Sequence, residues 1–196
     1  MATQTNRAIA WLDLLEQLAS LMKIPAVHWA DAWPDGGVKP RSRPAVRHLP
    51  SVLRLGDAAT APVCALCYQQ HPVLHWRRNS SYGDADFLDG YAYCELIGPS
   101  GHWRHEQIAL GLLLLGPRVT YPPHAHPAAE IYAVVAGRAS WQQGDGVWRT
   151  RGPADTIHHA SMEPHAMRTD DEPLLATYVW QDHLHEPARL LDPPRD

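Results

Sequence analysis

The first part of the chain repeats apolar residues at intervals of three and four, which is the spacing of one face of an α-helix. The positions that show it are Trp11, Leu14, Leu15, Leu18, Leu21 and Met22. We therefore predict a helix over residues 9–22, with Asn6 as its N-cap and Pro25 as the residue that stops it.

Prolines and glycines interrupt the pattern after this helix. Residues 31–50 contain four prolines and the pair Gly36-Gly37, which predicts a long irregular loop. A second helical region is expected between about residues 49 and 76. Pro62 and Pro72 should break this region into pieces, because proline cannot continue a helix from its interior.

After Gly83 the apolar residues fall into short runs bounded by glycine and proline, which is typical of β-strands. Eight segments have this form: Tyr91–Ile97, Gln107–Leu115, Glu130–Ala136, Ala139–Gln142, Val147–Thr150, Thr156–Ala160, His165–Thr169 and Leu174–Trp180. The sequence thus predicts a mainly β protein built on a closed jelly-roll barrel. We expect residues 1–90 to form a helical N-terminal extension packed on the barrel, 91–185 the barrel, and 186–196 a C-terminal tail.

Charge and composition exclude several classes of partner. The formal net charge is −4, and no basic cluster exceeds Arg77-Arg78, so we expect no nucleic-acid partner. No apolar run reaches the length of a membrane span and the N-terminus lacks a secretory signal, so we expect no membrane partner and a cytoplasmic location. The three cysteines are too few for a disulfide framework and should be reduced thiols.

The segment from residue 116 to residue 137 concentrates the residues that can carry chemistry. In an extended chain His124 and His126 share one face, and so do Glu130 and Tyr132. His165 follows in a later strand. Imidazoles with one carboxylate suit one divalent transition metal ion (Fe²⁺, Zn²⁺, Mn²⁺, Ni²⁺ or Co²⁺) rather than Ca²⁺ or Mg²⁺. We predict that His126, Glu130 and His165 bind this ion, with His124 as a fourth ligand.

Other histidines are expected to contribute less. His158 and His159 are adjacent on a predicted strand, so at most one of them can face the pocket. Four more histidines are expected at the surface or the rim of the pocket: His102, His105, His183 and His185.

The predicted ligands resemble the two motifs of the cupin superfamily, in which His-x-His is followed by Glu and Gly and a later strand adds another His. The matching positions are His124, His126, Glu130, Gly137 and His165. The resemblance implies the cupin double-stranded β-helix. One position departs from the motif, because the glycine that usually lies six residues before the first His is replaced by Arg118. The glycine of this chain is Gly116, so the preceding turn is expected to differ.

Within that superfamily the chain is similar to the cupin-type dimethylsulfoniopropionate lyases, which release dimethyl sulfide and acrylate. The shared features are Tyr132 after the motif Glu, the approach Tyr121-Pro-Pro-His124, the stretch Pro-His-Ala-Met-x-Thr from residue 164 to residue 169, and the helical extension. The resemblance covers most of the chain. It implies a metal-dependent carbon–sulfur lyase that acts by β-elimination on this or a related small carboxylate.

Such an elimination assigns roles to four aromatic residues. Tyr132 is the candidate base, because a nearby cation favours its phenolate, and Tyr121 is the second candidate for catalysis. Aromatic faces hold a sulfonium, so Tyr121, Tyr178 and Trp180 are the candidate substrate-binding residues. Alternatives stay open: Tyr132 could only hydrogen-bond Glu130, Tyr121 could only shape the entry turn, and Tyr178 and Trp180 could only fill the barrel.

Two other functions are compatible with the same ligands. One is another metal-dependent cupin enzyme, and a dioxygenase of this kind would consume oxygen, whereas an isomerase would not. The other is a non-enzymatic cupin that senses a metal or ligand, which would usually carry a DNA-binding or anti-sigma helical module. The first 90 residues contain neither a basic recognition helix nor a Cys/His cluster. Cupins often pair through edge strands, so a homodimer is also compatible with the resemblance.

Overall fold

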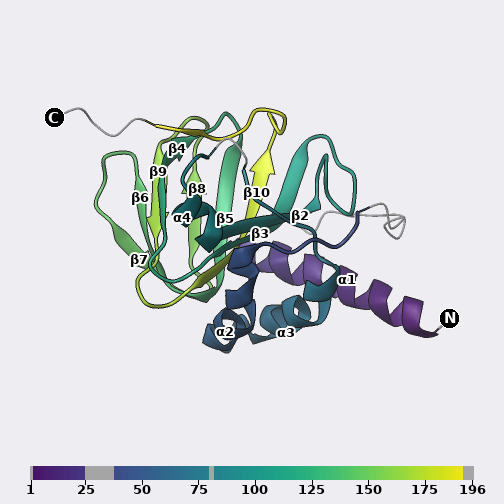
Figure 1. Cartoon of the computed structure of the whole chain (residues 1–196). Helices are drawn as coiled ribbons and strands as arrows, with labels where there is room; N and C mark the ends of the chain where they lie inside the picture. The colour runs from purple at the N-terminus through teal and green to yellow at the C-terminus, as the bar shows by residue number, and fades with distance from the viewer. Residues whose placement is uncertain (1, 25–37, 80–81, 192–196) are drawn as a thin grey trace.

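The computed structural model describes residues 2–24, 38–79 and 82–191. Two antiparallel sheets face each other, and helices cover the outer face of one of them (Figure 1). The strands are β1 (Trp76–Arg77), β2 (Tyr91–Ile97), β3 (Ile108–Leu115), β4 (Thr120–Ala125), β5 (Ala129–Gly137), β6 (Ala139–Gln143), β7 (Arg149–Arg151), β8 (Thr156–His159), β9 (His165–Arg168), β10 (Leu174–Gln181) and β11 (Arg189–Leu190). One sheet has the order β1-β2-β3-β10-β5-β8 and the other β11-β4-β9-β6-β7. The predicted mainly β jelly roll is confirmed.

Most of the helical structure precedes the sheets in sequence. The helices are α1 (Ala2–Met22), α2 (Leu49–Val52), α3 (Ala61–Gln70) and α4 (Ala85–Gly90), with 3-10 helices at Pro44–His48, Leu53–Leu55 and His71–Val73. Helix α1 already includes Asn6, so the prediction of Asn6 as the N-cap is wrong. Residues 2–5 contain neither glycine nor proline, and nothing in them stops the helix. The predicted stop at Pro25 lies outside the described residues.

Prolines mark where helices begin. Pro62 lies in the first turn of α3, and Pro72 lies in the first turn of the 3-10 helix that follows. A missing amide proton costs nothing at these positions, so the second helical region is broken as expected. The predicted loop is confirmed for residues 38–43, but it is wrong from Pro44 onward, because Pro44 starts a 3-10 helix and α2 follows it.

Three strands and one helix are additional to the predicted elements. Strand β4 escapes prediction because Pro122 and Pro123 lie in its middle. Its register with β9 shifts between Tyr121 and His124, so the prolines fall at an irregularity of the ladder, where proline is tolerated. Strands β1 and β11 have two residues each. Helix α4 is capped by Asp84, whose carboxylate accepts the backbone N–H groups of residues 86 and 87.

The six-stranded sheet has two different faces, because alternate residues of a strand point to opposite sides. The outer face packs on the helices through aliphatic residues, which are Leu110, Leu112, Leu114, Val135, Leu175 and Val179 against Leu14, Leu15 and Leu18 of α1. The inner face packs toward the second sheet through mostly aromatic residues, which are Tyr91, Leu113, Tyr132 and Tyr178 against Tyr121, Trp141 and Met167. The inner face therefore has the character expected of a binding pocket.

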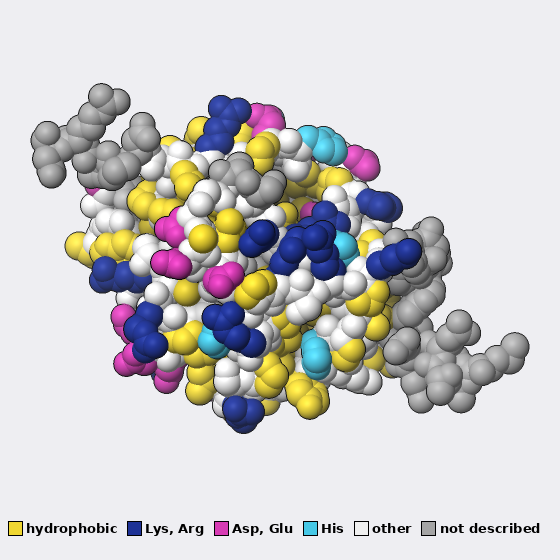
Figure 2. Space-filling view, in the orientation of Figure 1, with side chains coloured by type: hydrophobic (Ala, Val, Ile, Leu, Met, Phe, Trp, Pro, Cys, Tyr) yellow, Lys and Arg dark blue, Asp and Glu magenta, His cyan; other side chains and the backbone are white. Residues whose placement is uncertain are grey.

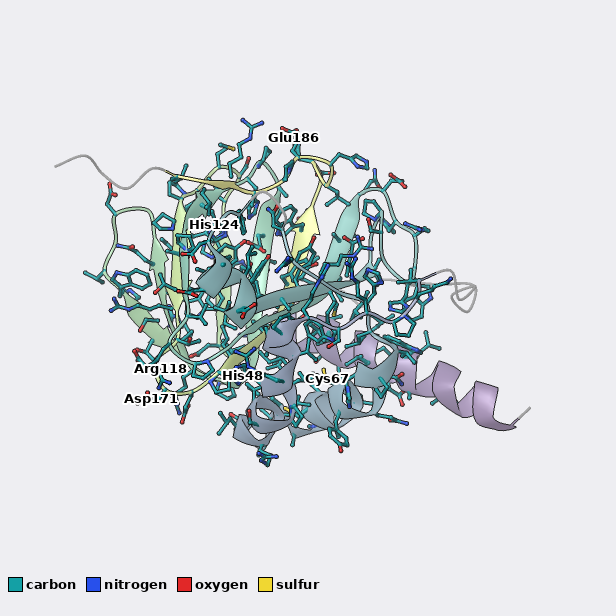
Figure 3. All side chains as sticks on the ribbon, viewed as in Figure 1. His48, Cys67, Arg118, His124, Asp171 and Glu186 are labelled. Carbon is teal, nitrogen blue, oxygen red and sulfur yellow. The ribbon has the colours of Figure 1, made fainter. Side chains whose placement is uncertain are left out.

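The three cysteines are free thiols and are buried, as expected. Cys67 lies in the helical layer (Figure 3), and burial raises the pKa of Cys94 to about 12. Burial also raises the pKa values of Cys64 and Cys67, so these thiols are protonated. Among the described helices, none is long and apolar enough to cross a membrane.

Candidate functional site

Three histidines from the inner side of the barrel converge on one point. His124 lies near the end of β4 and is paired in register with His165 at the start of β9, while His126 directly follows β4. One ring nitrogen from each lies within 4.8 Å of the others, and all three residues are buried. Figure 3 shows His124 among the strands, well away from the helical layer. The predicted His124, His126 and His165 are thus brought together.

Glu130 of β5 closes this group from the opposite sheet. Its Oε2 lies 3.1 Å from His126 Nε2 and 3.3 Å from His165 Nε2. Its Oε1 accepts a hydrogen bond of 2.6 Å from the indole nitrogen of Trp180. Burial alone would raise the pKa of Glu130, but the neighbouring rings of His126 and His165 hold it below its ordinary value. The carboxylate is therefore ionised.

The other ring nitrogen of each histidine is fixed by the backbone of its own segment. The Nδ1 atom of His124 lies 2.9 Å from Pro122 O, and that of His126 lies 2.9 Å from Ala128 O. The Nδ1 atom of His165 lies 2.8 Å from Glu163 O. Because a carbonyl oxygen can only accept, each Nδ1 carries the proton. A neutral ring then presents the lone pair of Nε2 to the centre of the group.

The donor set fits a transition metal ion. Two groups with lone pairs, His126 Nε2 and Glu130 Oε2, face each other at 3.1 Å, which is unfavourable unless a cation or a proton lies between them. His165 Nε2 is buried and has no hydrogen-bond partner among the described residues. Backbone carbonyls that orient the imidazoles are typical partners of metal-binding histidines. Three imidazoles and one carboxylate are ligands for the predicted class of ion.

Aromatic rings enclose the histidines. The ring of Tyr121 stacks on His124, with centroids 4.0 Å apart and planes within 8°. The ring of Trp180 stacks on His126, with centroids also 4.0 Å apart. Burial, and after it the neighbouring His165, lower the pKa of His124 well below its ordinary value. This ring is therefore neutral at physiological pH, as a metal ligand must be.

A cavity of about 250 Å³ lies beside this group. Glu130 lines it, together with six of the seven tyrosines of the chain, namely Tyr82, Tyr91, Tyr93, Tyr121, Tyr132 and Tyr178. Arg77 and Glu95 contribute opposite charges to it, and Trp180 also lines it, as do Leu184, His185, Pro187 and Ala188. The cavity can hold one small molecule that has both apolar and charged parts.

The structure places all four predicted aromatic residues in the wall of this cavity. The hydroxyl of Tyr121 lies 2.9 Å from that of Tyr82. Burial, followed by the charge of Glu130, raises the pKa of Tyr132 well above the ordinary value. Trp180 is half-buried, and it both lines the cavity and donates a hydrogen bond to Glu130. Tyr178 lies beside Tyr132 on the neighbouring strand.

Sequence reasoning missed other residues of the site. His159 is buried and stacks on His165 with centroids 4.0 Å apart, whereas His158 is exposed, so only one of the pair faces inward, as expected. Burial and the neighbouring His165 lower the pKa of His159 to about 4. Strand β2 contributes Tyr91, Tyr93 and Glu95 to the cavity. Their spacing of two residues is a signal of a shared face that could have identified them.

Basic side chains gather outside the cavity. A shallow hollow lined by Lys39, His75, Arg77 and Arg104 adjoins the cavity and shares Arg77 and Ser100 with it. Figure 2 shows several Lys and Arg side chains grouped near the centre of one face. His183 and His185 are exposed as expected. His102 is not a simple rim residue, because it is partly buried and packs against Trp11 with ring centroids 5.1 Å apart.

Known proteins resemble this chain in both sequence and fold. The family model described as dimethylsulfoniopropionate lyase (DMSP lyase) matches residues 20–176. The chain is 35% identical over 202 residues to the dimethylsulfoniopropionate lyase DddQ of Ruegeria pomeroyi, with 98% of both chains covered. The crystal structure of DddQ from Ruegeria pomeroyi DSS-3 matches with a TM-score of 0.79 and 30% identity, over 95% of this chain and 98% of that one. A chain from the crystal structures of the DMSP lyases RdDddP and RnDddQII matches with a TM-score of 0.81 and 26% identity, over 94% and 98%. These matches confirm the expected cupin fold.

Proposed function

The chain belongs to the dimethylsulfoniopropionate lyase family, and on this premise we propose that it is a metal-dependent carbon–sulfur lyase. It cleaves dimethylsulfoniopropionate, or a closely related small acid, to dimethyl sulfide and acrylate by β-elimination. The observation that carries this proposal is the buried group of three histidines and Glu130, of which Glu130 lines an adjoining cavity together with six tyrosines. The group offers metal ligands, and the cavity offers aromatic faces for a sulfonium.

The ligands of the metal ion are His124, His126, Glu130 and His165. The donor set favours Fe²⁺, Zn²⁺, Mn²⁺, Ni²⁺ or Co²⁺. When bound, such an ion supplies a Lewis acid that stabilises the negative charge developing on the substrate carboxylate. Trp180 and the three backbone carbonyls keep the ligand side chains in place before the substrate arrives.

Tyr132 is the proposed base. Its phenolate oxygen takes the proton from the carbon next to the carboxylate, and the electron pair of that C–H bond forms the double bond of acrylate. The bond between the next carbon and sulfur breaks, and its electrons leave with dimethyl sulfide, which is neutral. The position of Tyr132 in the cavity wall, two residues after Glu130, supports this role.

The pKa of Tyr132 is consistent with a base that works only when the site has bound its metal ion. Without a cation, burial and Glu130 raise the pKa of this phenol, so it stays protonated at neutral pH. If Glu130 held a divalent cation, its negative charge would be offset and the phenolate of Tyr132 would be favoured. The chain's own residues therefore make proton transfer depend on metal binding.

The remaining aromatic residues are proposed to bind and orient the substrate. Tyr121 is the second catalytic candidate, because its hydroxyl faces the cavity and shares a hydrogen bond of 2.9 Å with Tyr82. Tyr178 and Trp180 offer aromatic faces next to Tyr132 and Glu130. Each such face is worth about 0.5–2 kcal/mol to a bound sulfonium.

The experiment that tests the function is the direct measurement of product. Metal-loaded protein is incubated with dimethylsulfoniopropionate, and dimethyl sulfide in the headspace is measured by gas chromatography alongside acrylate in solution. We expect equal amounts of both products and no consumption of oxygen. Oxygen uptake without dimethyl sulfide would instead identify a dioxygenase, and the proposed reaction would then be wrong.

A further inference from the structure

A second carboxylate faces the cavity, far from the metal ligands along the sheet. Glu95 of β2 pairs in register with Gly111 of β3, Gly111 with Tyr178 of β10, and Tyr178 with Tyr132 of β5. Glu95, Tyr178 and Tyr132 all line the cavity. One row across the inner face therefore leads from the proposed base, over an aromatic ring, to a carboxylate that the proposed reaction does not use.

Gly111 allows the aromatic ring to reach this carboxylate. A side chain at position 111 would lie 2.7 Å from the Tyr178 hydroxyl and would overlap the backbone oxygen of Cys94. In the absence of a side chain, Tyr178 extends over β3 until its hydroxyl lies 3.5 Å from Cys94 O on β2. After burial, the charge of Glu95 is the largest influence that raises the pKa of Tyr178. Ring and carboxylate are thus close neighbours.

Within the described part of the chain, no cationic side chain lies within salt-bridge distance of Glu95. Its Oε1 accepts the backbone N–H of Ser100 at 2.6 Å, but none of the ion pairs within 4.0 Å among the described residues includes it. Arg77 lines the same cavity and donates to the carbonyl of Ser100 instead. Burial raises the pKa of Glu95, and only part of this shift is offset by the Ser100 amide and then Arg77. A cationic ligand next to this carboxylate would be stabilised.

We propose that Glu95 and the ring of Tyr178 form the subsite for the cationic end of the substrate. This inference rests on the proposed function and deepens it. The substrate carboxylate lies toward Glu130 and Tyr132, and the onium group, sulfonium or quaternary ammonium, lies on Tyr178 next to Glu95. Glu95 thereby determines specificity, because it favours zwitterionic onium acids over neutral-tailed acids of the same shape.

Two unreactive probes of equal shape, one with a cationic tail and one with an uncharged tail, separate the effect of charge on affinity from the effect of shape. They are 3-(trimethylammonio)propanoate and its uncharged-tail isostere 4,4-dimethylpentanoate, and their dissociation constants are measured by calorimetry on zinc-loaded protein. We expect wild-type protein to bind the ammonium compound at least about tenfold more tightly than the isostere. Glu95→Gln keeps an oxygen for the Ser100 amide but removes the charge. It should lose most of that preference, while its affinity for the isostere changes less than about twofold.

The matched control is Glu16→Gln, at an exposed position of α1, which should leave both affinities unchanged. Equal weakening of both probes in Glu95→Gln would overturn the proposal, because it would mean that Glu95 only holds the turn at Ser100. A wild-type protein without preference for the ammonium compound would overturn it without any variant. A wild-type protein that makes no dimethyl sulfide, yet shows the preference and loses it in Glu95→Gln, would contradict the proposed function and support the subsite.

Discussion

The two faces of the six-stranded sheet are made by the same strands but have opposite chemistry. On β3, Leu110, Leu112 and Leu114 point to the helices and are fully buried in an aliphatic core. On the other face, β2 and β10 carry Tyr91, Tyr93, Glu95, Tyr178 and Trp180 around a cavity. The two faces differ because successive side chains of a strand point to opposite sides of the sheet.

The difference teaches which face supports folding and which supports chemistry. The outer face is sealed by α1 and α3 through apolar side chains, and its buried Thr177 donates a hydrogen bond to the carbonyl oxygen of Gly111. The inner face contains ionisable groups at high density, and burial strongly shifts the pKa values of His124 and Tyr132, while His126 and His165 lower that of Glu130. Substitutions on the outer face should therefore change stability, and those on the inner face should change metal binding or turnover.

The largest effect is expected from loss of a ligand. His126→Ala should lose most of its bound metal, and turnover should fall by at least about a thousandfold, or about 4 kcal/mol. The barrel should remain folded, since its outer core is untouched. Elemental analysis and circular dichroism measure the two effects, with the exposed His158→Ala as control. Full metal occupancy in both His126→Ala and His165→Ala would show that these two histidines are not metal ligands.

The next effect concerns the outer face. Leu112→Ala removes a fully buried side chain from the core between sheet and helices, so the free energy of unfolding should fall by about 3 kcal/mol. At temperatures where the variant is folded, turnover should stay within about twofold of wild type. Denaturant titration gives the stability, and headspace dimethyl sulfide gives the turnover. A large loss of turnover in the folded variant would contradict the separation of the two faces.

A somewhat smaller effect is expected from the proposed base. Tyr132→Phe keeps the ring but removes its titratable oxygen, so turnover should fall by at least about a hundredfold, or just under 3 kcal/mol, with metal content and substrate affinity nearly unchanged. If metal is lost as well, Tyr132 holds Glu130 rather than acting on substrate. Retention of more than about a tenth of wild-type turnover would rule Tyr132 out, and Tyr121 would be tested next.

The smallest effect is a pH dependence at the junction of α1 and the sheet. Burial, then His75 and Arg77, lower the pKa of His102 to about 4. The unfolded chain takes up a proton near pH 6.5 and the folded chain does not, so stability is full above that pH and falls as pH drops toward 4. Because the ring is partly exposed, we expect a loss of at most about 2 kcal/mol.

Thermal unfolding of wild type and His102→Leu between pH 7 and pH 4 measures this contribution. The variant should lose less stability than wild type on acidification, although it need not be more stable at pH 7. Parallel pH profiles for the two proteins would show that His102 is not the group responsible.

The sequence predicted the grouping of the proposed metal ligands better than the cavity beside them. His124, His126 and Glu130 are close in sequence, and their spacing of two and four residues can be interpreted without knowing the fold. Strand β4 itself was hidden by Pro122-Pro123, whose role is apparent only from the shifted register with β9.

The cavity could not be predicted in the same way because distant segments build it. Glu95 and Tyr178 are 83 residues apart in number but meet across Gly111, and only the pairing of β2, β3 and β10 shows this. His159 faces inward because β8 pairs with β5 in one particular register. Tyr82 precedes the first long strand and has no periodic pattern that would place it beside Tyr121. Such contacts depend on the tertiary fold rather than on local propensity.

The contact of Trp11 with the turn after β2 limits how fast that turn can open. Trp11 is buried, and its ring lies against both His102 and Trp103, with centroids 5.1 and 5.3 Å away. The same turn carries Ser100, whose amide holds the carboxylate of Glu95. This turn cannot swing away from the barrel unless α1 first releases Trp11. Amide exchange at Ser100 should therefore be as slow as the undocking of α1, so a rare motion in the helical layer sets how long the wall of the cavity keeps its shape.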